Sequence, residues 1–160
     1  QTAFATVFSA LSSNTRRKDM ARRYAREVAM KLFYQKELSG QADIDAVIAM
    51  DADYSFNKRD TEYIQYVLKK FEENSSEIDN YIKRFVKDWS FNRIAKVDLA
   101  ILRLAICEIL YCDDIPACVS INEGIELAKK YSGEKAGKFI NGILGSLVRS
   151  LQLVPEGKSK

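Results

Sequence analysis

The segment from Lys96 to Tyr111 constrains the fold more than any other part of the chain, because it is apolar on nearly every side. An amphipathic helix keeps one face for water, whereas a helix that is apolar all round has to be surrounded by other elements. We therefore expect a central, buried helix here. Two charged residues, Arg103 and Glu108, interrupt the run, and we expect each to be paired or to lie at the edge of the core.

Helical periodicity extends over the rest of the chain, and no segment reads convincingly as a strand. Apolar residues recur at spacings of three and four over about 16–38, 58–73, 74–87, 116–131 and 134–151, with shorter helical segments near 44–48 and 89–94. The sequence thus predicts an all-α fold of six or seven helices. We expect the helical domain to span 16–152, after an N-terminal extension (1–15) that is weakly ordered or a short helix and before a flexible tail (153–160).

Capping residues suggest where these helices begin and end. Asn14 or Thr15 is a candidate cap for the helix from residue 16, and Gly40 is a candidate stop. Two further starts have the form of a capping box, in which a polar residue is followed three positions later by glutamate. They are Asn74 with Glu77, and Ser120 with Glu123; the second of these helices has Pro116 as its alternative start.

Several classes of site are disfavoured by composition. The chain has no histidine, which is the commonest general base and metal ligand. Its cysteines, Cys107, Cys112 and Cys118, form no C-x-x-C pair and fit reduced thiols in a cytoplasmic protein. The run from Asp51 to Glu62 resembles a calcium loop but has Phe56 where that loop needs glycine. Without an enzyme motif or a membrane-length apolar run, we expect no catalytic residue, cofactor, metal or membrane span.

A basic segment is the clearest pointer to a partner. Residues 15–31 contain seven lysines or arginines and two acids. Lys18, Arg22 and Arg26 recur every four residues and so form a ridge on one helix, with Arg23 one step around it. Clustered arginines bind phosphates, often with two parallel hydrogen bonds. A solvated helix face is the alternative, and the ridge alone does not decide between them.

A second candidate lies near the start of the last predicted helix. Single-stranded RNA is bound by aromatic side chains that stack on bases, together with cations that hold phosphates. Phe139 beside Lys138 has this combination, close to a helix N-terminus that itself attracts phosphate. Packing of Phe139 in the core is an equally open alternative.

Four motifs in order carry a resemblance to a known family. They are Arg22–Glu27 in the pattern R-R-x-A-R-E, Val97–Leu110 in V-D-x-A-I-L-R-L-A-x-x-E-I-L, Pro116–Lys129 in P-x-x-V-x-I-N-E-x-I-E-L-A-K, and Lys138–Leu144 as K-F-I-N-G-I-L. Together these motifs resemble the NusB family of bacterial transcription antitermination factors.

The resemblance implies two small helical bundles packed together. It implies binding of boxA, a short single-stranded RNA in leader and ribosomal RNA transcripts, jointly with the ribosomal protein NusE, within an antitermination complex on RNA polymerase. The matching motifs imply RNA contacts by Arg22, Arg23, Arg26, Lys138 and Phe139; Lys18 lies on the same ridge but is not fixed by a motif. Some members form homodimers that mask the RNA surface, so a homodimer stays open.

Two other hypotheses remain beside this one. The first is the NusB-like RNA-binding domain of a ribosomal RNA cytosine methyltransferase. The second is a dimerising helical interaction module in which the arginine ridge is only solvated. The order of the four motifs favours the cytoplasmic antitermination factor over both.

Overall fold

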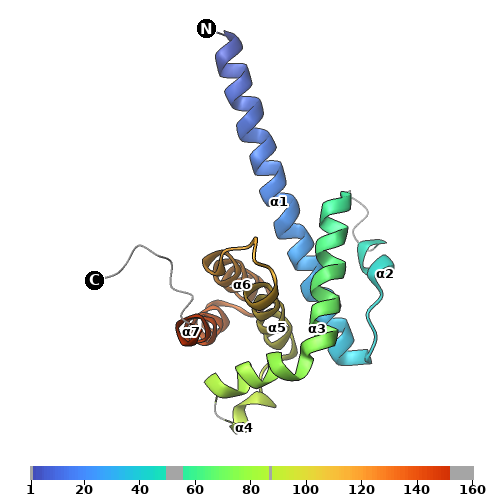
Figure 1. Cartoon of the computed structure of the whole chain (residues 1–160), viewed down its shortest axis with the longest axis vertical. Helices are drawn as coiled ribbons and strands as arrows, with labels where there is room; N and C mark the ends of the chain where they lie inside the picture. The colour runs from blue at the N-terminus through green and yellow to red at the C-terminus, as the bar shows by residue number, and fades with distance from the viewer. Residues whose placement is uncertain (1, 50–55, 87, 152–160) are drawn as a thin grey trace, which may run out of the picture.

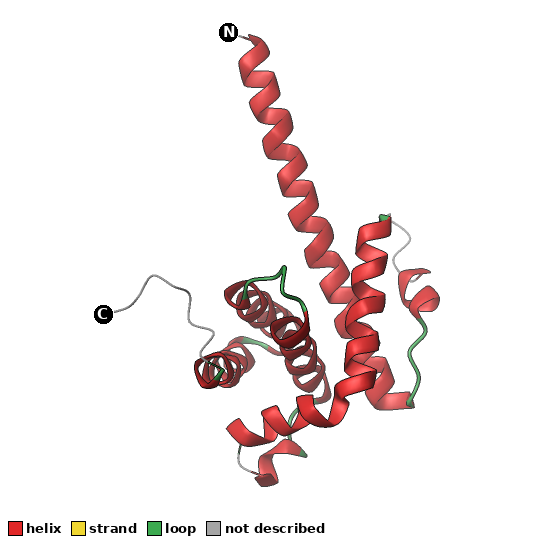
Figure 2. Ribbon diagram, in the orientation of Figure 1, coloured by secondary structure: helices red, strands yellow, loops and turns green. Residues whose placement is uncertain are grey.

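The computed structural model describes residues 2–49, 56–86 and 88–151, and these form seven helices without a strand. Figures 1 and 2 show their arrangement. The helices are α1 (Thr2–Ser39), α2 (Ile44–Ala49), α3 (Lys58–Phe85), α4 (Asp88–Phe91), α5 (Lys96–Tyr111), α6 (Ala117–Ser132) and α7 (Glu134–Ser150). The prediction of an all-α protein of six or seven helices is confirmed.

Helix α5 is the centre of the fold, as its composition predicts. Every residue of α5 from Asp98 to Glu108 is buried. The helix packs against α1 and α3 on one side and against α6 and α7 on the other. The helices thus form two small bundles, one of α1–α3 and one of α5–α7. Helix α5 lies between them and contacts both (Figure 1).

Arg103 is paired, as expected for a cation inside this helix. Its guanidinium donates hydrogen bonds of 2.9 Å to both carboxylate oxygens of Asp79 on α3, and one of 2.7 Å to Glu37 on α1. The hydrogen bonds from Arg103 lower the pKa of Glu37, and a further one comes from Lys96. One cation of α5 thereby holds α1 and α3 together.

The predicted start of the first helix is wrong. Helix α1 runs without interruption from Thr2, so Asn14 and Thr15 lie inside it and not at its start; the uncharged residues before them contain no helix breaker. The predicted division at Asn74 is present as a kink, because Asn74 has non-helical backbone angles and separates two helical stretches that together form α3. The Asn74 side-chain amide donates back to the Lys70 carbonyl of the preceding stretch.

Of the two starts predicted for the next helix, the one at Pro116 is confirmed and the capping box at Ser120 is wrong. Helix α6 begins directly after Pro116, and the backbone amide of Ser120 bonds to the Pro116 carbonyl. The Ser120 hydroxyl is buried without a hydrogen-bond partner among the described residues, and Glu123 is used elsewhere. By contrast, Gly40 ends α1 as predicted, with a positive φ of 78° that glycine adopts without strain.

None of the helices described is both long and apolar enough to cross a membrane. In the same part of the chain, no group of three or more cysteine and acidic side chains is placed to hold a metal ion. The calcium-loop-like positions 51–55 lie outside the described residues, and Asn57 caps α3 by accepting a hydrogen bond from the Asp60 amide. Cys107 and Cys112 are buried thiols, and Cys118 is exposed.

Candidate nucleic-acid interface

The three arginines of the predicted ridge lie in three different environments. Arg23 is the exposed one, with 64% of its side chain accessible. Its Nε donates a 3.0 Å hydrogen bond to Glu123 of α6. Because a guanidinium has five N–H groups, Arg23 can keep this bond and still present donors to a phosphate. It fits the predicted RNA contact.

Arg26 has a different role from the one predicted for it. Its residue exposure is only 3%, and it binds Glu108, which is fully buried in α5. The Nη2–Oε1 distance is 2.7 Å and the Nε–Oε2 distance is 2.9 Å. Burial alone would lower the pKa of Arg26, but the hydrogen bonds with Glu108 outweigh it and raise the pKa above its ordinary value. A phosphate would have to break this pair, so Arg26 positions α1 on α5 instead.

Arg26 and Arg23 are nevertheless linked through one carboxylate. Glu123 lies 3.0 Å from Arg23 Nε through one oxygen and 3.8 Å from Arg26 Nη1 through the other. The buried pair thus helps to fix Glu123, and Glu123 fixes the exposed arginine. Sequence reasoning assigned Glu123 to a helix cap and missed this bridge.

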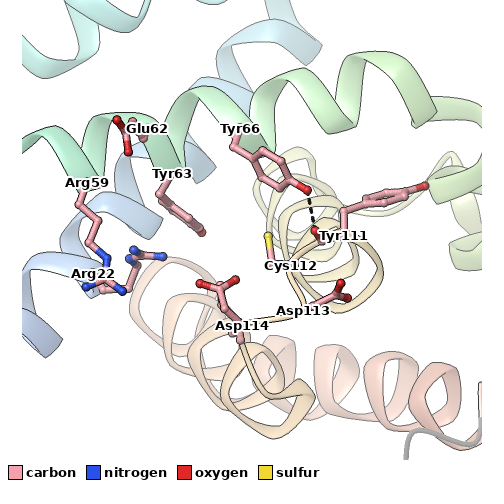
Figure 3. Close-up of a pocket in the computed structure, with 10 residues that line it drawn as sticks. Arg22, Arg59, Glu62, Tyr63, Tyr66, Tyr111, Cys112, Asp113 and Asp114 are labelled. Carbon is pink, nitrogen blue, oxygen red and sulfur yellow. Dashed lines mark hydrogen bonds between the residues drawn. The ribbon is translucent and has the colours of Figure 1, made fainter.

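Arg22 lines a hollow of about 510 Å³ between α1, α3 and the turn that joins α5 to α6. Its guanidinium lies 4.4 Å from the centre of the buried Tyr63 ring. Arg22 and Arg59 stand at one end of the hollow, and Tyr66, which bonds to the Tyr111 carbonyl, stands at the other (Figure 3). Among the described residues, no carboxylate oxygen lies within ion-pair distance of Arg22, so its charge is available.

The last turn of α6 connects the basic part of α1 to α7. Lys130 binds both oxygens of Glu27 on α1, at 2.9 and 3.1 Å, and the Tyr131 hydroxyl bonds to the same carboxylate. Burial tends to raise the pKa of Glu27, but these hydrogen bonds prevail and lower it. In Figure 1, α6 accordingly lies between α7 and α1.

On its other side, α6 packs closely against the start of α7. An added Cβ at the buried Gly137 would lie 3.0 Å from Lys129 Cγ, so the lysine stem lies directly over the α7 backbone. Lys138 follows, and both it and Phe139 are exposed; 38% of Phe139 is accessible. Of the two alternatives left open for Phe139, the structure excludes packing in the core, because the side chain is exposed.

The residues Arg23, Lys129, Lys130, Lys138 and Phe139 therefore lie on α1, α6 and α7, where α6 is bound to α1 through side chains and packs against α7, and we call this set the basic face. Lys18 lies on α1, but its side chain is outside the described residues. Lys129 and Lys130 were not among the predicted site residues. Their signal was ambiguous, since lysines in the last turn of a helix also stabilise the helix dipole.

The two buried thiols, Cys107 and Cys112, offer no reactive centre. Burial raises the pKa of Cys112 to about 12 and that of Cys107 further, so both remain protonated at neutral pH.

The chain is similar to known proteins over the same helices. The model of the NusB family matches residues 23–149. A transcription antitermination protein NusB from Acetivibrio thermocellus is 49% identical over 138 residues, covering 86% of this chain and 95% of the relative. A second NusB, from Natranaerobius thermophilus, is 47% identical, covering 82% of this chain and 97% of the relative.

Solved structures agree with the fold. NusB from T. maritima superimposes with a TM-score of 0.71 at 38% identity, covering 80% of this chain and 90% of that one. A chain in a structure of the antitermination factors NusB and NusE in complex with double-stranded RNA has a TM-score of 0.71 at 26% identity, covering 82% of this chain and 98% of that one.

Proposed function

The chain belongs to the NusB family, and on that premise we propose that it is a transcription antitermination factor, which binds boxA-like single-stranded RNA together with ribosomal protein NusE. In this role it supports transcription of ribosomal RNA as part of an antitermination complex on RNA polymerase. The place of action is the cytoplasm, and no catalytic step is assigned to any residue.

The observation that carries this proposal is the basic face. Arg23, Lys130 and Lys138 come from α1, α6 and α7, and an exposed aromatic ring, Phe139, directly follows Lys138 on α7. Cations alone would suit any polyanion. An accessible aromatic ring among them suits unpaired bases, because a base inside a duplex has no free ring face to offer. The arrangement therefore favours single-stranded RNA over duplex.

The partner is supported by the comparisons. The similar chain belongs to a solved complex of the antitermination factors NusB and NusE with double-stranded RNA, and this chain covers 98% of it. The curated relatives are named as antitermination proteins and are covered almost in full. This favours the antitermination factor over the RNA-binding domain of a methyltransferase. A dimerising module without RNA binding leaves the exposed Phe139 and Lys138 unexplained.

The test is fluorescence anisotropy with a labelled boxA RNA and a scrambled RNA of equal length. Each RNA is titrated with the protein alone and with NusE, at two salt concentrations. Selective binding of boxA that NusE tightens is the expected result. Equal, weak and salt-sensitive binding of both RNAs would reject the proposal, because phosphate contacts alone give that behaviour.

A further inference from the structure

Helix α7 contains three glycines, and the structure accounts for only two of them. Glycine is a poorer helix former than every residue except proline, so a glycine within a helix calls for a reason. An added Cβ at Gly137 would press on Lys129, and one at Gly145 would lie 3.3 Å from Arg149 Nη1. An added Cβ at Gly142 would have no described atom within 4 Å. Nothing inside the described part of the chain requires glycine there.

The position of Gly142 on the helix shows what its missing side chain leaves open. It follows Lys138 by four residues and Phe139 by three, so the three share one exposed face. Side chains on a helix lean toward its N-terminus and cover the preceding turn. A side chain at residue 142 would therefore stand over that turn, on the same face as Phe139, with its Cβ more than 4 Å from the ring. Its absence leaves bare backbone beside an accessible aromatic ring.

We propose that Gly142 is the floor of a subsite for one unpaired RNA base, which lies over the α7 backbone and against Phe139 while Lys138 holds an adjoining phosphate. This inference rests on the proposed function and adds a residue to it. A flat base needs access to the ring from the side on which a Cβ would stand. The neighbouring Lys138 is a cation and can bind a negatively charged group that is attached to the occupant. This favours a nucleotide over an apolar peptide side chain.

The variant Gly142→Ala tests the subsite, because it should make the protein more stable and at the same time weaken its binding to RNA. The added methyl group enters open space and improves helix propensity, so the melting temperature should rise by about 2–4 °C. The dissociation constant for boxA RNA with NusE should increase about tenfold, within the range for losing one base stack. Gly145→Ala is the control: it adds the same methyl group nearly two turns from Phe139, against the flexible end of Arg149, and should leave RNA affinity unchanged.

A set of boxA RNAs, each lacking one base, identifies the occupant. One of these RNAs should bind the wild type more weakly than intact boxA does. The Gly142→Ala variant should bind that RNA and intact boxA equally well, since the methyl group and the missing base abolish the same contact. A more stable Gly142→Ala protein with unchanged affinity for boxA would overturn the inference and leave the proposed function intact. Weaker binding of NusE by this variant in the absence of RNA would also overturn it, since the occupant would be protein. Failure of the wild type to select boxA would instead reject the proposed function itself.

Discussion

Arg26 of α1 and Glu108 of α5 form a buried pair with two short hydrogen bonds, although 82 positions separate them in the chain. Neither side chain reaches solvent to any useful extent. The pair joins the first bundle to the central helix, and Arg26 also lies 3.8 Å from Glu123, which binds Arg23. It therefore couples the stability of the fold to the geometry of the basic face.

We expect Arg26→Ala to unfold much more easily than the wild type. It leaves the Glu108 carboxylate buried without its partner, and breaking one side of a buried pair costs about 3–5 kcal/mol. Urea denaturation followed by circular dichroism measures this loss. The variant Arg26→Leu with Glu108→Leu removes both charges and should recover most of the stability. If Arg26→Ala is as stable as the wild type but binds boxA RNA weakly, Arg26 contacts RNA and our assignment is wrong.

The contrast between Arg22 and Arg26 shows that the sequence predicts where a side chain lies on its helix but not which partner it meets. The four-residue spacing correctly places both on one side of the helix. It cannot say that a carboxylate on α5 meets only the second of them, because that depends on how α1 packs. A signal was present, since Glu108 inside an apolar helix needs a cation, but the sequence does not identify which one.

Helix interiors were more predictable than helix ends. Apolar periodicity and the uniformly apolar α5 give the fold class, because burial dominates these segments. A polar side chain that could cap a helix can instead form a hydrogen bond or ion pair elsewhere in the fold. Glu123, expected to cap α6, binds Arg23 instead, and Asn74 bonds backward within a continuing α3. Tertiary contacts thus decide the polar residues that local rules leave open.

We expect Arg23→Ala to weaken RNA binding with little effect on folding. Its ion pair with Glu123 is exposed on the arginine side, and such pairs contribute about 0–1 kcal/mol. Loss of one phosphate contact should lower the slope of log affinity against log salt by about one. Anisotropy over a series of salt concentrations measures the slope. Arg84→Ala, on an exposed part of α3, is the control; an unchanged slope for Arg23→Ala would remove Arg23 from the interface.

Phe139→Ala should reduce RNA affinity by about 1–3 kcal/mol, as loss of one stacked base does. Because the ring is an exposed side chain of α7, the melting temperature should stay close to that of the wild type. Anisotropy and thermal melting of the same preparation give both values. Phe139→Tyr keeps a ring face and should retain most of the affinity. A large drop in melting temperature with unchanged affinity would instead make Phe139 a structural residue.

Stability should fall in acid because of two carboxylates of α1. Hydrogen bonds from Lys130 and Tyr131 lower the pKa of Glu27, and those from Arg103 and Lys96 lower the pKa of Glu37, from an ordinary value of 4.5. Below about pH 4.5 the unfolded chain binds more protons at these sites than the folded one does, so protons favour unfolding. The stabilisation is complete above that pH and is lost as the pH falls through the lowered values. Denaturation measured from pH 7 to pH 3 should show this decline.

The variants Glu27→Gln and Glu37→Gln should each be less stable than the wild type at pH 7 and should each lose less stability on acidification. The two sites have no common partner, since one binds α6 and the other binds α5. Their effects should therefore be nearly additive in the double variant. An acid decline as steep in the double variant as in the wild type would assign the pH dependence to other groups. Such a result would leave Lys130 as a member of the basic face without a role in holding α6 to α1.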